Sequence, residues 1–404
     1  MIYTKTYSNG LTLLAKPMPY LKSCTFNLRI PSGVAFENPS RRGVSSFTCE
    51  MALRGCGRWN SRQFIEQLRS RGASWDENIG IANTTFLASF PSIYLHDILE
   101  IYAALAQNAH FDESFLESSR QRMILERIGI EDAPTLVARL AAEKEFFPIP
   151  WNENSYGDLD VLYSVTLEEL KTFYQTYYRP DGTILAVAGA FDWNELQDEV
   201  ESLFSSWRTQ GTLKIEETPP TRQNLHIDFD SQQTQIVVAF DGVPYQQPDY
   251  YCQWAGAYIL GRDGSGRLFT QLRERQGLCY WVDAYSSVIV NGSGVFCRLG
   301  TNSEHSELAL DCLLKEIQRL FKYGITEDEL GWLKTNVRAD IIMSQESSDI
   351  QAAHLVSDWF LMRRCKTIEE QLSTIDKLTV DTVNDFLLKN APKDFLITTL
   401  GKRS

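Results

Sequence analysis

The chain has 404 residues, of which 43% are hydrophobic and 23% are charged, a composition typical of a globular protein. Its formal net charge of −13 leaves no excess of basic side chains to neutralise phosphates, which argues against a nucleic-acid partner. The length exceeds what one ordinary core fills, so we expect two domains. The eight cysteines are scattered without a C-x-x-C pair, a pattern typical of reduced thiols rather than of a disulfide framework.

The N-terminal residues lead from Met1 directly into a strand pattern that ends at an Asn9-Gly10 hairpin turn. This stretch has no signal-peptide pattern, and the chain has no apolar run of about 18 residues. These features predict a cytoplasmic protein that does not span a membrane.

The first half is predicted to run from strands to several helices and back to a strand. The stretch Phe26–Glu37 reads as a strand and loop, and it leads into a short helical segment at Gly43–Met51. A capping box at Thr166–Glu169 predicts a helix start, and the β-branched run Thr183–Gly189 predicts a strand. Further helices are expected at 92–108, 112–129 and 133–146, and a further strand at 81–90.

A polar stretch with two consecutive prolines separates the halves. Residues 213–224 include Pro219-Pro220 and break the hydrophobic periodicity, so we place a linker there, between domains 1–212 and 225–404.

The second half repeats the plan of the first. The pattern of Phe64–Arg71 returns in Leu268–Arg275, and the strand Thr183–Gly189 has a counterpart in Phe395–Gly401. Such self-similarity predicts a duplicated unit, and therefore an α+β fold of two tandem homologous domains. Helices of the second half are expected at 248–260, 266–275, 304–323, 327–345 and 349–362, and strands at 234–241, 281–290 and 294–300.

Six segments follow one another in a specific order and spacing. They are Gly33-x-x-x-Glu37, Gly43–Met51, Phe147-Pro148 with Gly157, Tyr178–Asp181, Gly189, and Arg267–Tyr280 with its R-L-F-x-x-L-R-x-R-x-G-L-x-Y pattern. Together they resemble the pitrilysin/insulinase family of zinc peptidases, in the branch that contains relatives of mitochondrial processing peptidase. The resemblance covers nearly the whole chain, and it implies a duplicated α+β roll that forms half of a clamshell chamber for peptides.

Family members that cleave peptides carry the zinc motif H-x-x-E-H on the helix that corresponds to Gly43–Met51. The resemblance places Ser46, Cys49 and Glu50 at its three defining positions and Arg127 at a later glutamate ligand, while a second family glutamate falls on Arg120. A guanidinium brings positive charge where a metal cation needs compensating anions. We therefore predict that this chain holds no metal ion and no other cofactor.

This alignment also predicts how the substituted side chains are arranged. Because Cys49 and Glu50 are adjacent, we expect them to point to different sides of the helix, and we expect Glu126 to point away from the ligand position of Arg127. An unpaired carboxylate in a partly buried cleft is costly. We therefore predict an ion pair between Glu50 and Arg127 or, failing that, Arg120.

The motif of the second half is kept. Arg273 and Tyr280 lie seven positions apart, the spacing at which family members place an arginine and a tyrosine that assist the active site of the other half or of a partner subunit. The resemblance therefore implies a catalytic role in trans for both residues. For the loop Gly261–Gly266 two interpretations stay open: Gly264 and Gly266 let the backbone approach a peptide closely, or the loop is an ordinary helix start.

Our main functional hypothesis is a non-metal-binding subunit of a heterodimeric zinc peptidase. A homologous partner would carry H-x-x-E-H and the zinc, and this chain would supply Arg273 and Tyr280 for peptide substrates. The alternative is a non-catalytic scaffold or peptide-binding pseudo-peptidase, against which the retained Arg/Tyr spacing argues. A self-sufficient hydrolase ranks last, because neither Cys49 nor Cys279 has a histidine base that the sequence identifies.

Overall fold

The computed structural model describes residues 2–211, 213–262 and 264–402, and the chain divides into two compact units. Unit 1 comprises Met1–Gly129, Glu153–Glu217 and Ser344–Thr367, and unit 2 comprises Ile130–Asn152, Thr218–Met343 and Ile368–Ser404. The change of unit after Glu217 falls inside the predicted linker 213–224. The predicted domains 1–212 and 225–404 are continuous in sequence, whereas each compact unit also takes in one helix from the other half of the chain.

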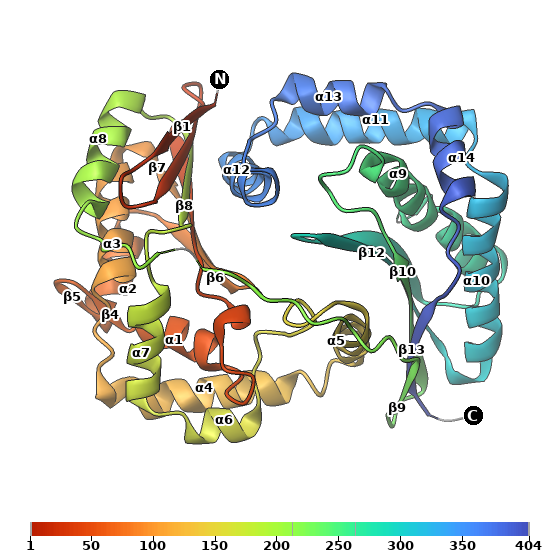
Figure 1. Cartoon of the computed structure of the whole chain (residues 1–404), viewed down its shortest axis with the longest axis horizontal. Helices are drawn as coiled ribbons and strands as arrows, with labels where there is room; N and C mark the ends of the chain where they lie inside the picture. The colour runs from red at the N-terminus through yellow and green to blue at the C-terminus, as the bar shows by residue number, and fades with distance from the viewer. Residues whose placement is uncertain (1, 212, 263, 403–404) are drawn as a thin grey trace. The chain divides into compact units, whose positions relative to one another are not determined.

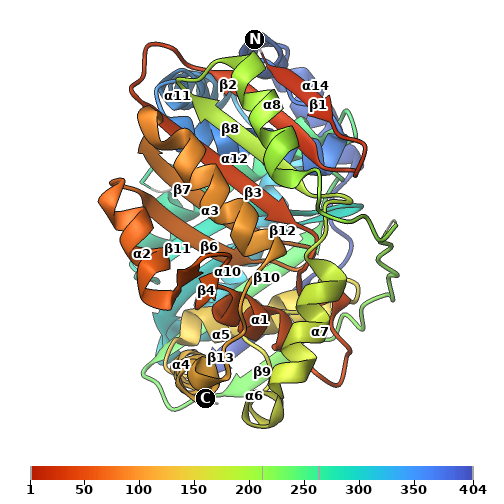
Figure 2. The same cartoon turned by 90° about the vertical axis from the view of Figure 1, so that its left-hand side faces the viewer.

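Unit 1 is built on a six-stranded sheet (Figures 1 and 2). Its order is β1-β2-β8-β3-β7-β6; β2 and β8 pair in parallel, and the other neighbours pair antiparallel. The strands are β1 (Tyr3–Thr6), β2 (Thr12–Pro17), β3 (Ser23–Ile30), β6 (Ser74–Ile79), β7 (Thr84–Pro91) and β8 (Ile184–Gly189), beside a small hairpin of β4 (Gly55–Cys56) and β5 (Trp59–Asn60).

Helices cover both faces of this sheet. Alternation along β3 sends Phe26 and Leu28 into the main core, on the face where α3 and α8 lie, whereas Thr25 faces α12 and bonds to the Ser348 hydroxyl at 2.8 Å (Figures 1 and 2). The helices of unit 1 are α1 (Val44–Ala52), α2 (Ser61–Ser70), α3 (Leu95–Gln107), α4 (Leu116–Gly129), α6 (Leu159–Ser164), α7 (Leu167–Tyr177), α8 (Trp193–Phe204) and α12 (Ser348–Met362).

Unit 2 repeats the strand pairing of unit 1. Its sheet has the order β11-β12-β10-β13-β9, in which β9 and β13 pair in parallel and the other neighbours pair antiparallel. This matches β6-β7-β3-β8-β2 strand for strand, so the predicted duplication is visible in the topology. The strands are β9 (Leu225–Asp228), β10 (Gln233–Asp241), β11 (Trp281–Ile289), β12 (Gly292–Asn302) and β13 (Leu396–Gly401).

The helices of unit 2 confirm the predicted order, with α5 on one face of the sheet and α10 on the other (Figure 1). One expected helix differs in kind, because residues 269–275 form a π-helical turn, η4 (Phe269–Arg275), instead of an α-helix. The α-helices are α5 (Pro134–Phe146), α9 (Tyr250–Gly261), α10 (Ser306–Tyr323), α11 (Glu327–Ser344), α13 (Ile368–Asp376) and α14 (Val380–Lys389).

The helix that unit 1 takes from the second half of the chain, α12, covers apolar side chains of β2 and β8. Leu355 and Val356 of α12 pack with Leu14, Ile184 and Ala186, and all five are at most 3% exposed. Burial of this face excludes water from side chains that the first half of the sequence alone would expose. Residues 1–212 therefore do not contain all the side chains that unit 1 buries.

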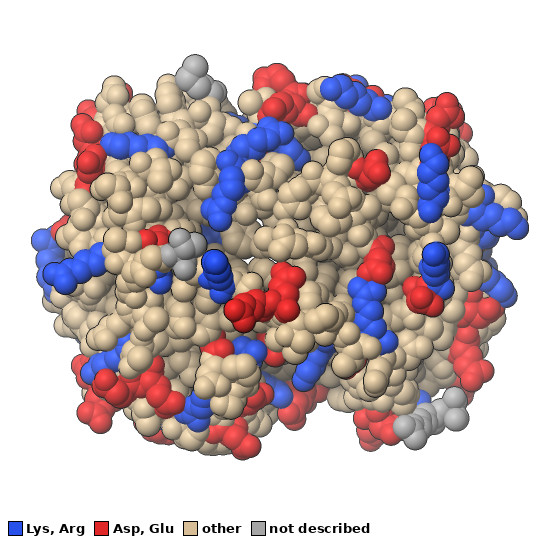
Figure 3. All heavy atoms as spheres, viewed as in Figure 1, with Lys and Arg blue, Asp and Glu red and all other residues tan. Residues whose placement is uncertain are grey.

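The surface carries both signs of charge. Acidic and basic side chains are interspersed on the face drawn in Figure 3. Within the described residues, each helix is too short or too polar to cross a lipid bilayer.

Replacement of Leu355 by alanine tests the packing of α12. Because Leu355 is 3% exposed, we expect Leu355→Ala to lower the free energy of unfolding by about 2–5 kcal/mol. The matched control is Leu388→Ala in α14, where the leucine is 68% exposed and the change should stay within about 0.5 kcal/mol. Urea denaturation followed by circular dichroism measures both, and equal effects would contradict the packing.

Candidate functional site

Helix α1 carries the positions of the substituted metal motif, and a buried carboxylate fixes where the helix begins. The Glu37 side chain is 0% exposed and accepts hydrogen bonds from the Ser45 amide at 2.7 Å, the Ser45 hydroxyl at 2.6 Å and the Gly43 amide at 3.1 Å. These amides at a helix start have no partner within the helix. Burial raises the pKa of Glu37, while the hydrogen bonds and the Arg42 charge oppose the rise.

Two glycines bring a second loop against the same helix start. Gly43 and Gly157 both have positive φ, and a Cβ on Gly157 would lie only 2.6 Å from Gly43 Cα. Asp158 donates its amide to the Arg42 carbonyl at 3.1 Å, and the Arg42 guanidinium pairs with Glu153 at 3.1 Å. The loop before α6 is therefore fixed to Arg42 and Gly43, the two residues that lead into α1.

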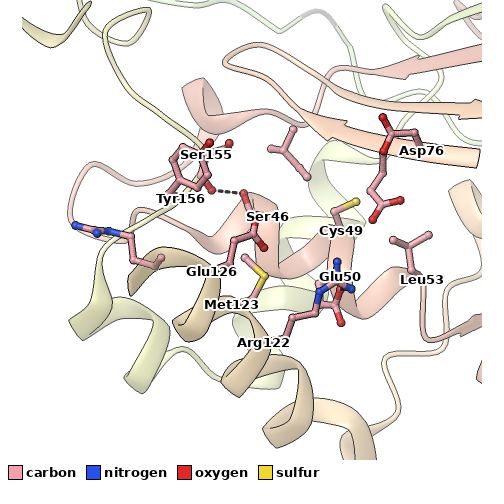
Figure 4. Close-up of a pocket in the computed structure, with 13 residues that line it drawn as sticks. Ser46, Cys49, Glu50, Leu53, Asp76, Arg122, Met123, Glu126, Ser155 and Tyr156 are labelled. Atoms are coloured by element: carbon pink, nitrogen blue, oxygen red, sulfur yellow. Dashed lines mark hydrogen bonds and ion pairs between the residues drawn. The ribbon is translucent and has the colours of Figure 1, made fainter. Parts of the chain in front are cut away.

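A pocket of about 260 Å³ opens beside α1 (Figure 4). It lies among α1, α4, the edge strand β6 and the loop that Gly157 holds in place. The residues that line it are Ser46, Cys49, Glu50, Leu53, Asp76, Glu77, Ile79, Arg122, Met123, Glu126, Arg127, Ser155 and Tyr156.

All three motif positions face this pocket (Figure 4). The expectation that Cys49 and Glu50 point to different sides is wrong, because positions i, i+3 and i+4 from Ser46 share one helix face. Glu126 also lines the pocket beside Arg127, which corrects the expectation that it points elsewhere. The Ser46 hydroxyl donates a short hydrogen bond to the Ser155 carbonyl.

The carboxylate of Glu50 is compensated by arginines other than the predicted ones. Glu50 is 5% exposed. Its Oε1 accepts hydrogen bonds from the Arg54 guanidinium and, at 3.1 Å, from the Ser119 hydroxyl, and its Oε2 accepts one from Arg122 at 2.7 Å. Arg54 also donates to Ser119 at 3.1 Å, so the four side chains form one network. The predicted ion pair of Glu50 with Arg127 or Arg120 is therefore wrong, because Arg54 and Arg122 pair with this carboxylate.

The two predicted arginines hold backbone carbonyls instead. Arg120 donates to the carbonyls of Leu162 and Val165 at the end of α6, the second at 2.9 Å. Arg127 donates to the Gly157 carbonyl at 3.1 Å. Since the three side chains have the same length, their different positions on α4 account for the pairing, and Arg122 is the one that reaches Glu50.

Two further carboxylates, those of Asp76 and Glu77 in β6, line the pocket. Burial raises the pKa of Glu77, the Arg122 charge opposes that rise, and the charges of Asp76, Glu50 and Glu126 add to it. Arg122 therefore offsets the negative charge of Glu77 as well as that of Glu50.

This set of side chains does not fit a zinc ion. The hydroxyl of Ser46 is a poor zinc ligand, and both oxygens of Glu50 already accept hydrogen bonds. Burial raises the pKa of the Cys49 thiol well above its ordinary value, and Glu77 raises it further, which disfavours the thiolate that binds metal. Among the described residues, no group of three or more His, Cys, Asp and Glu side chains is arranged to hold a metal ion.

The Arg/Tyr pair of unit 2 is exposed. Tyr280 is 56% exposed, and its amide donates to the Gly300 carbonyl at 2.9 Å, which anchors the residue at the start of β11. Arg273 is exposed on η4, with its guanidinium carbon 5.0 Å from the centre of the Phe269 ring. Within the described part of the chain, no carboxylate forms an ion pair with Arg273, and the Tyr280 hydroxyl makes no hydrogen bond.

The glycines of the neighbouring loop have different roles. A Cβ on Gly266 would come within 2.6 Å of the Arg262 carbonyl oxygen, so glycine is required there by local packing. Gly264 has a φ of +75° and no atom within 4 Å of its Cβ position, so it faces open space. Packing therefore accounts for Gly266, and an exposed turn accounts for Gly264, whose part in peptide binding stays a prediction.

Several residues of the Glu50 network and the pocket are not among those predicted from the sequence. Arg54 follows Glu50 by four positions, and the i,i+4 rule for oppositely charged helix neighbours signals that pair. Arg122, Ser119 and the β6 carboxylates carry no comparable signal, because only the packing of α4 and β6 against α1 brings them together.

Fold and site together define an α+β protein of the metallopeptidase type whose metal-ligand positions hold other side chains. The family model of insulinase, peptidase family M16, matches residues 13–148, and the model described as the peptidase M16 inactive domain matches residues 164–337. The chain therefore belongs to the pitrilysin/insulinase family, as its motifs predicted.

Individual relatives extend along nearly the whole chain. An uncharacterized zinc protease of Rickettsia felis is 28% identical over 378 residues, which cover 93% of this chain and 91% of that protein. The mitochondrial-processing peptidase subunit beta of Saccharomyces cerevisiae is 21% identical over 424 residues, which cover 96% and 89%. A crystal structure described as a peptidase M16 inactive domain from Pseudomonas fluorescens has a TM-score of 0.92 at 22% identity and covers 100% of this chain and 98% of its own. The comparisons support a non-catalytic member of the family with two tandem α+β domains.

Removal of the Arg122 guanidinium should destabilise the folded chain, because the buried Glu50 carboxylate loses one of its two charged partners. We expect Arg122→Ala to lower the free energy of unfolding by about 1–3 kcal/mol, because Glu50 is 5% exposed and would keep only one guanidinium. Arg62→Ala is the control, since Arg62 pairs with Glu66 on an exposed helix surface and should leave the unfolding midpoint unchanged. Thermal unfolding of both variants measures the difference, and equal midpoints would contradict the network.

Elemental analysis tests the metal prediction. We expect the purified chain, dialysed against buffer containing zinc and then against buffer without it, to retain zinc at background level only. Stoichiometric zinc that disappears in Glu50→Gln, but persists in the exposed control Glu66→Gln, would overturn the prediction.

Proposed function

We propose that this chain is the non-metal-binding subunit of a heterodimeric zinc peptidase. The partner subunit carries H-x-x-E-H and the zinc, and this chain contributes Arg273 and Tyr280 to the peptide substrate that the partner cleaves. The chain alone does not cleave peptides.

One observation carries this proposal: the metal-ligand positions of the family are substituted in this chain, whereas its arginine and tyrosine are present. The metal-ligand positions of α1 hold Ser46, Cys49 and Glu50, and Glu50 is neutralised by arginines. Arg273 and Tyr280 keep the family spacing and are exposed, and neither is engaged by a carboxylate of the described residues. An exposed guanidinium and an exposed phenol suit contacts to a group outside this chain.

The chemistry of the two side chains fits a peptide carbonyl. The Arg273 guanidinium and the Tyr280 hydroxyl are hydrogen-bond donors, and a scissile carbonyl oxygen gains negative charge as its carbon is attacked. Donors that are fixed before the reaction stabilise that charge without reorganising. One such donor typically contributes about 2.7–4 kcal/mol to the transition state, or roughly 10²–10³ in rate.

The similarity to a named subunit supports a partner. The yeast relative is a mitochondrial-processing peptidase subunit beta, so its name describes one subunit of a larger peptidase. The alternative is a scaffold or peptide-binding protein without a catalytic partner, for which exposed donors at the family spacing have no use. A neighbouring gene for a homologue with intact H-x-x-E-H distinguishes the two.

Co-expression with such a homologue tests the proposal directly. A complex that elutes as one peak in size-exclusion chromatography should cleave peptides in a zinc-dependent way. Arg273→Ala or Tyr280→Phe should lower kcat roughly 10- to 10³-fold without changing the zinc content of the complex.

The matched control is Arg275→Ala, because Arg275 lies on the same turn and is also exposed, with a single hydrogen bond to Gln271 at 3.4 Å. This variant should keep the rate of the unmodified complex. Unchanged kinetics for both Arg273→Ala and Tyr280→Phe would contradict the catalytic role and leave the scaffold alternative.

A further inference from the structure

The turn that carries Arg273 is held at its start by an ion pair that has no part in the chemistry itself. Arg267 lies two residues before η4 and pairs with Glu329 in the first turn of α11. Its Nε donates to Oε1 at 2.7 Å and its Nη2 donates to Oε2 at 2.7 Å. This parallel fork is the strong, directional geometry that arginine offers and lysine cannot reproduce.

The same two side chains also hold the loop between α10 and α11. Arg267 Nη2 donates to the Gly324 carbonyl at 2.8 Å. Glu329 accepts the Thr326 amide at 2.8 Å and donates its own amide to the Thr326 hydroxyl at 3.3 Å, so the two residues form the capping box at the start of α11. Burial alone would raise the pKa of Glu329, but the hydrogen bonds from Arg267 and Thr326 outweigh it and leave the pKa below its ordinary value.

The far end of the turn is fixed by backbone hydrogen bonds. The Leu278 amide donates to the Leu272 carbonyl at 2.8 Å, and the Gly277 amide donates to the Arg273 carbonyl at 3.1 Å. Gly277 has a φ of +62°, which lets the chain reverse toward β11 and Tyr280.

The segment between these two anchors, η4, is π-helical. Hydrogen bonds from residue i to i+5 widen the turn, and π-helices are rare and occur mostly as single turns, often at functional sites. In η4 the exposed Arg273 lies between the fork at Arg267 and the reversal at Gly277. A change at either anchor can shift the direction of the guanidinium.

We propose that Arg267 and Glu329 form a positioning clasp that fixes η4 and thereby sets where Arg273 points. The proposal rests on the proposed function only for its catalytic consequence, since the clasp itself can be measured in the isolated chain. Arg267 and Glu329 are positioning residues and do not touch the substrate.

The first experiment uses the isolated full-length chain. Arg267→Lys keeps the charge but loses the fork, and Glu329→Gln keeps an oxygen for Thr326 but loses the charge. Hydrogen–deuterium exchange of the amides in residues 268–280 should accelerate roughly tenfold in each variant, because that turn opens locally more often. The double variant should exchange no faster than the single variants, which shows that the two residues act as one unit.

The matched control is a second ion pair of unit 2 that lies outside this turn. Arg338 of α11 donates to Asp376 of α13 from Nε at 2.9 Å. Arg338→Lys should leave exchange of residues 268–280 unchanged. Unchanged exchange in a folded Arg267→Lys chain, or equal acceleration in Arg338→Lys, would overturn the clasp.

The second experiment measures catalysis by the complex with its partner. A misplacement of about 1 Å can cost 10²-fold in rate, so Arg267→Lys should lower kcat roughly 10- to 100-fold and leave KM nearly unchanged. A merely structural defect would instead lower the amount of complex, which size-exclusion chromatography reports.

The outcomes separate the clasp from the proposed function. If Arg273→Ala lowers kcat but Arg267→Lys does not, Arg267 is not a positioning residue. If Arg273→Ala itself has no effect, the proposed function fails, and hydrogen exchange alone decides whether the clasp exists.

Discussion

The buried carboxylate of Glu37 is the constraint on which the pocket of unit 1 depends. It binds the free amides at the start of α1, and Gly157 meets Gly43 at the same point so closely that a Cβ on Gly157 would lie 2.6 Å from Gly43 Cα. These contacts are made by the backbone and by a residue outside the metal motif, so they do not depend on the side chains that α1 turns toward the pocket. The helix frame and the metal chemistry are therefore physically separable.

That separation explains how the ligand positions changed without loss of the fold. A metal ion and its carboxylates form a charge-compensated cluster, and removal of the metal leaves a carboxylate that is expensive to bury. In this chain Arg54 and Arg122 supply the positive charge that Glu50 needs. The guanidiniums stabilise the carboxylate by direct hydrogen bonds, and the same bonds occupy the oxygens that a metal would require.

The two units have sheets with the same pattern of strand pairing, but they carry different functional side chains. In unit 1 every residue of α1 is buried, and the Glu50 carboxylate beside the pocket pairs with Arg54 and Arg122. In unit 2 the turn before β11 leaves Arg273 and Tyr280 exposed, whereas the Arg267 guanidinium donates hydrogen bonds to Glu329 and to the Gly324 carbonyl. The same strand pairing therefore supports an ion-paired carboxylate in unit 1 and a pair of exposed hydrogen-bond donors in unit 2. In both units the residue that fixes the local backbone, Glu37 or Arg267, is separate from these side chains.

The sequence by itself determined the family, the duplicated α+β plan, most helices and strands, and the identity of the side chains at the ligand positions, since periodicity, caps and motif order are local properties. It also contained the signal for Arg54, four residues after Glu50. Only the tertiary structure decided that Arg122 reaches Glu50 while Arg120 and Arg127 bind carbonyls, and that α12 covers the sheet of unit 1. The reason is that side-chain reach and helix packing depend on the relative placement of distant segments, which linear spacing does not encode.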